Sequence, residues 1–428
     1  MITIPFLFFL IFFIYLYKKN KGIDLSSYLV IPYIITSFFA IIIVHFEMYD
    51  HYNGIWKNAD ISVFAIITYC LLISLSIFPF SKIRSNNVTM VVCNNYKYID
   101  ILSYVLIFTF ISTVYTTYNN LGNILQSSLY EVRSEVYKEV EVQKVTGINW
   151  LIQLPYTLFK QFSPLALLFF FNNVANGRKT KLFNYLLFVS SLTPIVSAIL
   201  IAGRTQIIYW LLTFGLIYVF YRRMLTKKQK KYILKPFIIF GYLIGVFFII
   251  VTISRFYTNQ HGSGDESVIV YLGQQFLQFN YFFSNYECHQ ITLNRIFPLT
   301  YYFLIDPTWN LTDYRWLISS QNGGIDIGVF YTFLGDLLVD IDFVGMFLYV
   351  IIYSFISSKI CSNNNNIIEL RRLILVLVLI LIPLQGVFYY SYYRVDVSYF
   401  VIGSLLLYWS LGLKKINYAN SISNNTNL

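Results

Sequence analysis

The chain has 428 residues, of which 57% are hydrophobic, 20% aromatic and only 12% charged, and its mean hydropathy is +0.61. Soluble globular domains carry about 25% charged residues, so this composition excludes a soluble protein. The net charge of +11 does not by itself indicate a nucleic-acid partner, because in a membrane protein the position of each charge decides its meaning.

Apolar blocks of about 20 residues, the length of a membrane-crossing helix, predict an all-α, polytopic integral membrane protein with about eleven transmembrane helices. The first block has no basic residue before it and is followed by Lys18 and Lys19, so we interpret it as a retained helix and not as a cleavable signal peptide. The predicted spans are residues 2–17, 28–46, 61–80, 101–118, 151–174, 185–201, 206–221, 236–253, 343–358, 373–390 and 397–413.

These spans divide the chain into four regions. Residues 1–253 hold the first eight spans, 254–342 a large outer loop and re-entry segment, 343–413 the last three spans, and 414–428 an Asn- and Ser-rich tail. With the N-terminus outside, most Lys and Arg residues fall in predicted cytoplasmic loops, and the C-terminus is cytoplasmic. The densest basic run, Arg222 to Lys235, is therefore interpreted as a topological and anionic-lipid signal and not as a nucleic-acid patch.

The one long outer loop runs from Ser254 to about Gly328. It contains Trp309, Trp316 and the uncharged segment Val268 to Tyr286, a pattern typical of amphipathic helices that lie in the membrane interface over the bundle. Alternatively, residues 268–286 form a twelfth span, which would reverse the sidedness of the basic loops that follow. The outer-loop interpretation is favoured for that reason.

Five arginines gather on the predicted outer side, against the positive-inside bias. Guanidinium groups bind phosphate oxygens through paired, charge-assisted hydrogen bonds, so a diphosphate headgroup is the natural ligand. Alternatively, each arginine extends to the interface or pairs with an acid such as Asp306, Asp313 or Asp396. For Arg204, in a tight turn between two spans, ligand binding is favoured. The five are Arg204, Arg255, Arg295, Arg315 and Arg394.

Carboxylates on the same side are candidates for a general base. Asp336 and Asp340 are four residues apart and share a face if this segment is helical, although they can also simply solvate a helix end. His289 is a further candidate base, and no histidine spacing indicates a metal site. Lys160 interrupts the fifth predicted span, where a buried charge would be functional, or it lies in a loop if that span begins near Phe162.

At these residues the chain resembles the Wzy-type polymerases of O-antigen and capsular polysaccharide, also called oligosaccharide repeat unit polymerases. The resemblance covers the architecture of nearly the whole chain. Its motifs are few: a Gly203-Arg204 turn, a late outer loop that opens with Ser254-Arg255, and a sequence of Thr332, Gly335, Asp340 and Gly345 before the next span. Family members often have glycine where this chain has Asp342, which puts any role of a glycine there in doubt.

The resemblance implies a bacterial inner-membrane glycosyltransferase that joins repeat units carried on undecaprenyl diphosphate at the periplasmic face. Arg204, Arg255 and Arg394, with Arg295 and Arg315 near them, would hold the diphosphate, and Asp340 or Asp336 would position or deprotonate the acceptor hydroxyl. No cofactor or metal is required. The implied partners are the lipid-linked oligosaccharide, the bilayer, a chain-length regulator and a flippase, with no nucleic acid.

Other functions share this composition. A lipid-linked oligosaccharide flippase or transporter would have arginines facing a cavity, but inverted repeats and midplane charges are not evident. An O-antigen ligase would be closely related, an acyltransferase would be expected to show a stronger catalytic histidine within the membrane, and a structural scaffold would not require outward arginines.

Overall fold

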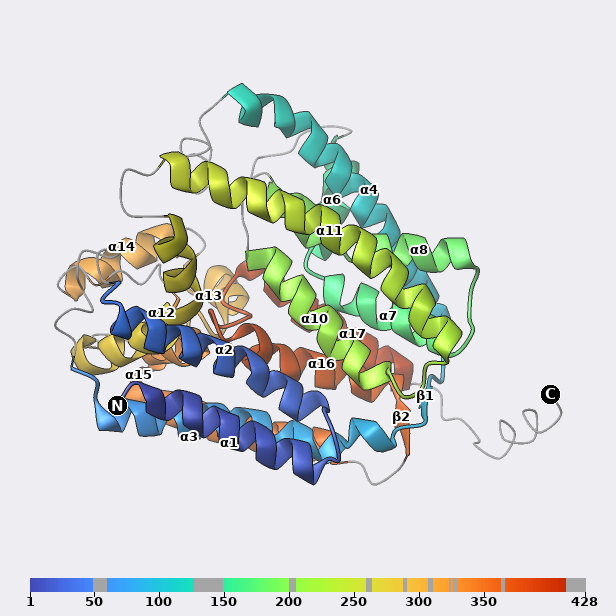
Figure 1. Ribbon diagram of the computed structural model, residues 1–428. Coiled ribbons are helices and arrows are strands. Elements are labelled where there is room, and N and C mark those ends of the chain that lie inside the picture. Colours follow the sequence, from blue (N-terminus) through green and yellow to red (C-terminus); the bar gives the residue numbers. More distant parts are fainter. Residues whose placement is uncertain are drawn as a thin grey trace.

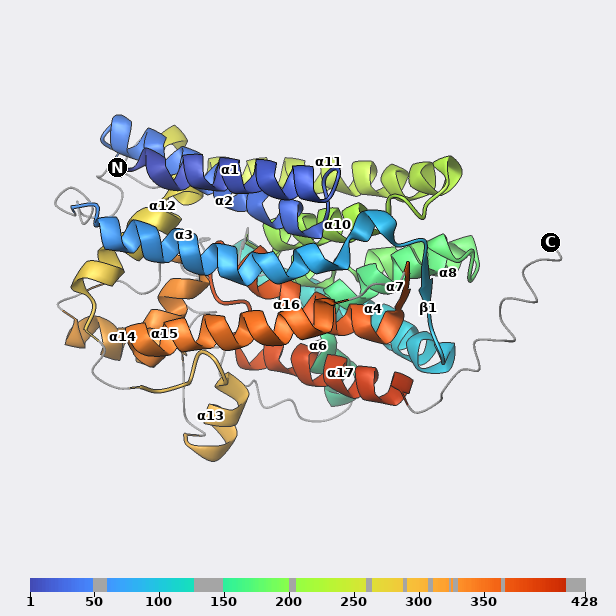
Figure 2. The ribbon, with the colours of Figure 1, turned by 90° about the horizontal axis from the view of Figure 1, so that it is seen from below.

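The computed structural model describes residues 1–48, 60–126, 149–199, 205–258, 264–287, 291–306, 311–322, 325, 330–362 and 366–412. Within this part the chain is mostly helical, as the sequence predicts. Its long helices run along a common direction and form a layered bundle (Figures 1 and 2). The N-terminal helices are α1 (Thr3–Lys19), α2 (Leu25–His45), α3 (Val63–Ile77), α4 (Tyr96–Gln126), α6 (Asn149–Phe159), α7 (Ser163–Ala175), α8 (Lys181–Ser190) and α9 (Thr193–Ile199).

Two short 3-10 helices, η2 (Phe78–Ile83) and η3 (Ser85–Asn87), follow α3, and two short strands, β1 (Met90–Val92) and β2 (Ile367–Glu369), lie in loops. The remaining helices are α10 (Thr205–Tyr221), α11 (Lys227–Thr258), α12 (Gly264–Asn285), α13 (Pro298–Leu304), α14 (Leu311–Gln321), α15 (Thr332–Cys361), α16 (Leu370–Gln385) and α17 (Val395–Gly412).

Six helical segments among the described residues are long and apolar enough to cross a membrane. This confirms a membrane-embedded, all-α protein. The six segments are Leu25–His45, Val63–Asn87, Tyr96–Tyr118, Lys181–Ala198, Thr332–Cys361 and Val395–Gly412.

The predicted inner loops meet at one end of the bundle. β1 and β2 pair in parallel, which joins the loop before α4 to the loop before α16. The Asn86 side chain donates to the carbonyl of Asn20 at 2.8 Å, and Arg223 donates to the carbonyl of Asn86 at 3.0 Å. Four loops predicted to share one face of the membrane therefore do lie at one end.

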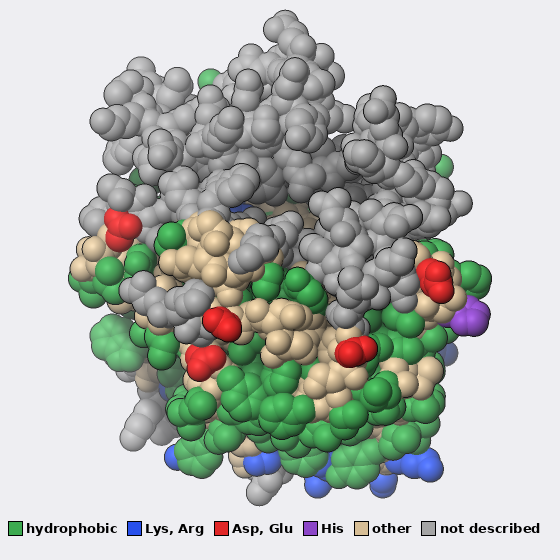
Figure 3. Space-filling model, turned by 90° about the vertical axis from the view of Figure 1, so that its left-hand side faces the viewer, with side chains coloured by type: hydrophobic (Ala, Val, Ile, Leu, Met, Phe, Trp, Pro, Cys, Tyr) green, Lys and Arg blue, Asp and Glu red, His purple; other side chains and the backbone are tan. Residues whose placement is uncertain are grey.

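The opposite end carries α12, α13, α14 and the start of α15 (Figures 1 and 2). Figure 3 shows this end of the molecule. Among the described residues, Asp and Glu side chains lie between hydrophobic groups, and Lys and Arg are seen mainly along the lower edge of the view. We call this the acidic end and the opposite one the basic end. The two ends thus differ in charge as the loop assignment predicts.

Helix α12 corrects one expectation, since it does not lie over the bundle. It packs against α2, α3 and α15, and its amides Gln274, Gln275 and Asn280 are all buried. Gly273 allows this packing, because a Cβ there would lie 2.5 Å from the backbone carbon of Phe39 on α2. The uncharged sequence is compatible with a position at the membrane interface. Its amides can be buried because they form hydrogen bonds within the protein: the Asn280 side chain accepts one of 2.9 Å from the backbone N–H of Ser62.

One other predicted span has a different boundary. Span 151–174 is divided into α6 and α7 by a turn, so Lys160 lies in a connection and not within a helix. Helix α15 consists of two helical segments joined by a kink at Asp342, where φ is 62° and ψ is 176°. Its second segment therefore begins next to residue 343, where the sequence predicts the start of a span.

Candidate functional site

The first turns of α15 place two carboxylates on one buried face, as their four-residue spacing predicts. Asp336 and Asp340 are 1% and 0% exposed. Arg295, which lies between α12 and α13 and is 1% exposed, forms an ion pair with Asp336 through Nη1. The same Nη1 donates to the hydroxyl of Tyr331, which itself donates to Asp336 at 3.1 Å.

The second oxygen of Asp336 binds another part of the chain. It accepts a hydrogen bond of 2.6 Å from the backbone N–H of Tyr390, in the loop between α16 and α17. The N–H groups of Thr332 and Phe333 donate to the carbonyls of Phe388 and Gly386 in the same loop. The start of α15 is thus fixed to the 386–394 loop by three hydrogen bonds.

Asp340 is bound by the loop that carries Arg295. Its Oδ1 accepts from the hydroxyl of Thr292 at 2.6 Å, and its Oδ2 accepts from the backbone N–H groups of Arg295 and Ile296 at 3.1 and 3.0 Å. Both carboxylates therefore have protein donors on both oxygens. We call Thr292, Arg295, Tyr331, Asp336 and Asp340 the Arg295 cluster.

The Arg295 guanidinium is held in its charged form. Burial opposes the charge, but Tyr331, Tyr314 and Asp340 outweigh burial and raise the pKa of Arg295 above its usual value. Burial raises the pKa of Tyr314 to about 12, so its ring, 5.7 Å from Arg295, stays neutral. One guanidinium and two carboxyl groups thus share this buried cluster.

Some polar groups beside the cluster have no partner among the residues that the structure describes. They are Nε and Nη2 of Arg295 and both side-chain atoms of Asn294, which is 1% exposed. Buried polar groups are nearly always hydrogen-bonded, so this edge of the guanidinium and the Asn294 amide are sites for water or for a ligand oxyanion.

A second polar group lies at the α6–α7 turn and the start of α17. Asp396 Oδ2 accepts from Lys160 at 3.1 Å, from Arg394 at 2.9 Å and from the Gln161 amide at 3.0 Å. The side chains of Lys160 and Arg394 remain 19% and 34% exposed. We call these four residues the Asp396 cluster. The cluster thus joins two partly exposed cations to one carboxylate.

The 386–394 loop connects the two clusters. Tyr390 in this loop binds Asp336, and Arg394 at its end binds Asp396. A change in the position of this loop would therefore alter the hydrogen bonds of both clusters.

The predicted site residues are distributed unevenly over these clusters. Arg295, Asp336 and Asp340 meet in one, and Arg394 lies in the other, paired with an acid as the alternative interpretation holds. Arg255 lies on α11 and Arg315 on α14, whereas Arg204 and His289 lie outside the described residues.

Sequence reasoning singled out Gln161 beside Lys160 but missed Thr292 and Tyr331. Each is an uncharged side chain whose role depends on a partner far along the chain, and no local motif marks it. Tyr331 precedes Asp336 by five positions, a spacing that does not mark a shared helical face.

Comparisons of the chain with protein-family models, with curated proteins and with solved structures found no match. Among the described residues, no group of three His, Cys, Asp or Glu side chains is arranged to hold a metal ion. The function must therefore be argued from the geometry.

Proposed function

We propose that this chain is an integral-membrane glycosyltransferase that polymerises oligosaccharide repeat units carried on undecaprenyl diphosphate, for an O-antigen or a capsule. The observation that carries the proposal is the Arg295 cluster. It joins an arginine of the late outer loop to both carboxylates that the resemblance marks at the start of the next span.

Packing at Gly335 and the backbone conformation at Asp342 explain why glycine is favoured at these two positions of the motif. A Cβ at Gly335 would lie 2.1 Å from Cδ2 of Tyr331, a member of the Arg295 cluster. Asp342, where family members often have glycine, adopts φ 62° and ψ 176°, a conformation that glycine occupies far more easily than other residues. Residue 342 thus has the backbone conformation that a glycine at this position would favour, which supports the resemblance.

The proposed reaction is a displacement at an anomeric carbon. A hydroxyl of the acceptor sugar attacks that carbon, the bond from the carbon to the diphosphate oxygen breaks, and the lipid diphosphate leaves with the bonding electrons. The hydroxyl proton passes to a general base. Cationic groups placed at the leaving diphosphate stabilise the charge that develops there, commonly by several kcal/mol.

The two clusters suit different parts of this reaction. In the Asp396 cluster, Arg394 and Lys160 are cationic and partly exposed, so we assign them to the diphosphate, together with the predicted Arg204, Arg255 and Arg315. Asp336 and Asp340 accept hydrogen bonds on both oxygens, so in this structure they position Arg295 and its loop. Their role as general base, and that of His289, stays a prediction.

We further propose that the protein spans the bacterial inner membrane eleven times, with a periplasmic N-terminus and a cytoplasmic C-terminus. The separation of the acidic and basic ends supports this orientation. The acidic end, with both clusters near the ends of their helices, would then face the periplasm, where lipid-linked repeat units are joined.

The test is to delete the gene in its native host and to resolve the surface polysaccharide by gel electrophoresis. A ladder that collapses to the acceptor with a single repeat unit supports a polymerase. Loss of even that unit points to a flippase or a ligase, and an unchanged ladder overturns the proposal.

A further inference from the structure

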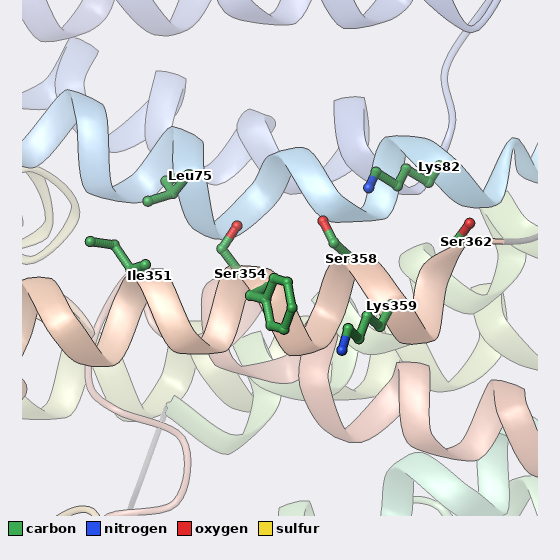
Figure 4. Close-up of a pocket in the computed structure, with 8 residues that line it drawn as sticks. Leu75, Lys82, Ile351, Ser354, Ser358, Lys359 and Ser362 are labelled. Carbon is green, nitrogen blue, oxygen red and sulfur yellow. The ribbon is translucent and has the colours of Figure 1, made fainter.

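A groove at the basic end is separate from both clusters. It has a volume of about 570 Å³ and lies between α3 with η2 on one side and α15 on the other (Figure 4). Leu75, Lys82, Ile351, Ser354, Phe355, Ser358, Lys359 and Ser362 line it.

The groove has an apolar part and a polar part. Leu75, Ile351 and Phe355 lie toward the middle of the bundle, and the two exposed side chains, Ile351 and Phe355, are 51% and 59% accessible. Lys82, Lys359 and Ser362 lie toward the basic end, and the Ser354 and Ser358 hydroxyls face α3 (Figure 4). In a bilayer this order places the apolar part at acyl-chain depth and the cations at headgroup depth.

The cations of the groove are not neutralised by neighbouring acids. The nearest acid along the chain, Glu369, forms its ion pair with Arg371. Neither Lys82 nor Lys359 has a carboxylate partner among the described residues, and Lys359 contacts the ring of Phe355 at 4.4 Å. Arg372 adds further positive charge near the mouth, since it donates to the carbonyls of Ile360 and Ser362.

We propose that this groove binds an anionic glycerophospholipid of the leaflet at the basic end. The lipid phosphate would lie between Lys82 and Lys359, and the glycerol and headgroup hydroxyls would bond to Ser358 and Ser362. One acyl chain would run along Leu75, Ile351 and Phe355. Charge complementarity and the order of apolar and cationic groups carry the assignment, because basic pockets between transmembrane helices are suited to anionic headgroups.

The experiment measures lipid adducts on the purified, full-length protein by native mass spectrometry, with phosphatidylglycerol and phosphatidylcholine as probes at equal concentration. We expect phosphatidylglycerol to bind preferentially. The double variant K82Q/K359Q should bind it about 30-fold less tightly, since each basic side chain near an anionic lipid contributes roughly a factor of five. The matched control K97Q/K181Q removes the same charge from two exposed lysines of other predicted inner loops, outside the groove and outside the Arg222–Lys235 run, and should keep the affinity within about twofold.

Two further measurements, on a charge-conserving variant and in the presence of inorganic phosphate, complete the test. The variant K82R/K359R keeps the charge and should bind phosphatidylglycerol as wild type does, which separates loss of charge from impaired folding of the Gln variant. Failure of the Arg variant to bind contradicts the proposal. Addition of inorganic phosphate should leave the adduct in place, because the acyl chain contributes to affinity. Equal binding of both lipids, or equal losses in the groove and control variants, would also overturn it.

Discussion

The hydroxyl of Thr292 donates a hydrogen bond of 2.6 Å to Asp340, which follows it by 48 positions in the chain. This bond and the two backbone N–H groups on the same carboxylate hold the segment 292–296 against the first turns of α15. Arg295 is thereby brought to Asp336, so the segment 292–296 and the start of α15 form one unit.

Replacing Thr292 with Val should loosen this unit. The change removes the hydroxyl and keeps the side-chain shape, and a hydrogen bond to a charged group contributes about 1.5–3 kcal/mol. We expect a lower melting temperature in a fixed detergent. T292S, which keeps the hydroxyl, should remain within about 0.5 kcal/mol of wild type; equal effects of Val and Ser would show that the hydroxyl is not what matters.

Replacing Asp336 with Leu should be severely destabilising, because it leaves the fully buried Arg295 without its counter-charge. Breaking a buried ion pair from one side costs about 3–5 kcal/mol. The matched control is R295M/D336L, which removes both charges and should recover much of the lost stability. A double variant no more stable than D336L would argue against the pairing as the cause.

Replacing Asp342 with Gly should stabilise the protein. The backbone at this exposed residue lies in a region that costs a non-glycine residue about 1–3 kcal/mol, against which glycine loses about 0.5–1 kcal/mol of chain entropy. D342A keeps the strained backbone and should show no such gain. The measurement is the unfolding temperature of the three proteins in the same detergent, and a D342G protein that melts below wild type contradicts this interpretation of the bend.

Replacing Gly273 with Ala should destabilise the contact of α12 with α2. A Cβ there would lie 2.5 Å from the Phe39 carbon and 2.7 Å from the Ala40 nitrogen, both backbone atoms that cannot rotate away. Overpacking of this kind costs about 1–3 kcal/mol. At Gly245 on α11 a Cβ would meet nothing within 4 Å, so G245A should be neutral or slightly stabilising, and similar losses at both positions would count against the close crossing.

Replacing Arg394 or Lys160 with Ala should reduce polymerisation more than stability. Both side chains are partly exposed, so their loss costs little in folding, whereas loss of one stabilising donor in a reaction centre lowers rates by about 100-fold or more. The readout is the polysaccharide ladder at matched protein levels. K231A, which removes a cation at the basic end, is the control, and a wild-type ladder from both R394A and K160A would remove the Asp396 cluster from the mechanism.

The sequence predicted the helical, membrane-embedded class of the fold, because a membrane imposes simple rules. Helix lengths follow the hydrocarbon thickness, and the loops before α4 and α16, both flanked by Lys and Arg, meet in the β1–β2 pairing. The turn between α6 and α7 was not predicted, and neither was the packing of α12, whose Gln274, Gln275 and Asn280 lie in a segment expected at the surface. Burial of amides depends on partners from other helices, such as Ser62, and no local pattern reveals those.

The candidate site was predictable only in part. The spacing of Asp336 and Asp340 places them on one helical face, and this was confirmed. Arg295 could be counted among five outward arginines, but nothing in its neighbourhood distinguished it from Arg394. Arg295 is buried against Asp336, whereas Arg394 is partly exposed beside Asp396, and this difference arises from long-range packing.

The most direct measurement uses the lipid-linked oligosaccharide that should accumulate in the deletion strain. Purified wild-type protein, reconstituted in liposomes with this material, should produce a ladder of longer chains and release one lipid diphosphate for each unit joined. D336L and R394A should fail to do so at equal reconstitution. If wild-type protein leaves the chain length unchanged, or only moves the lipid between leaflets, the polymerase account is wrong.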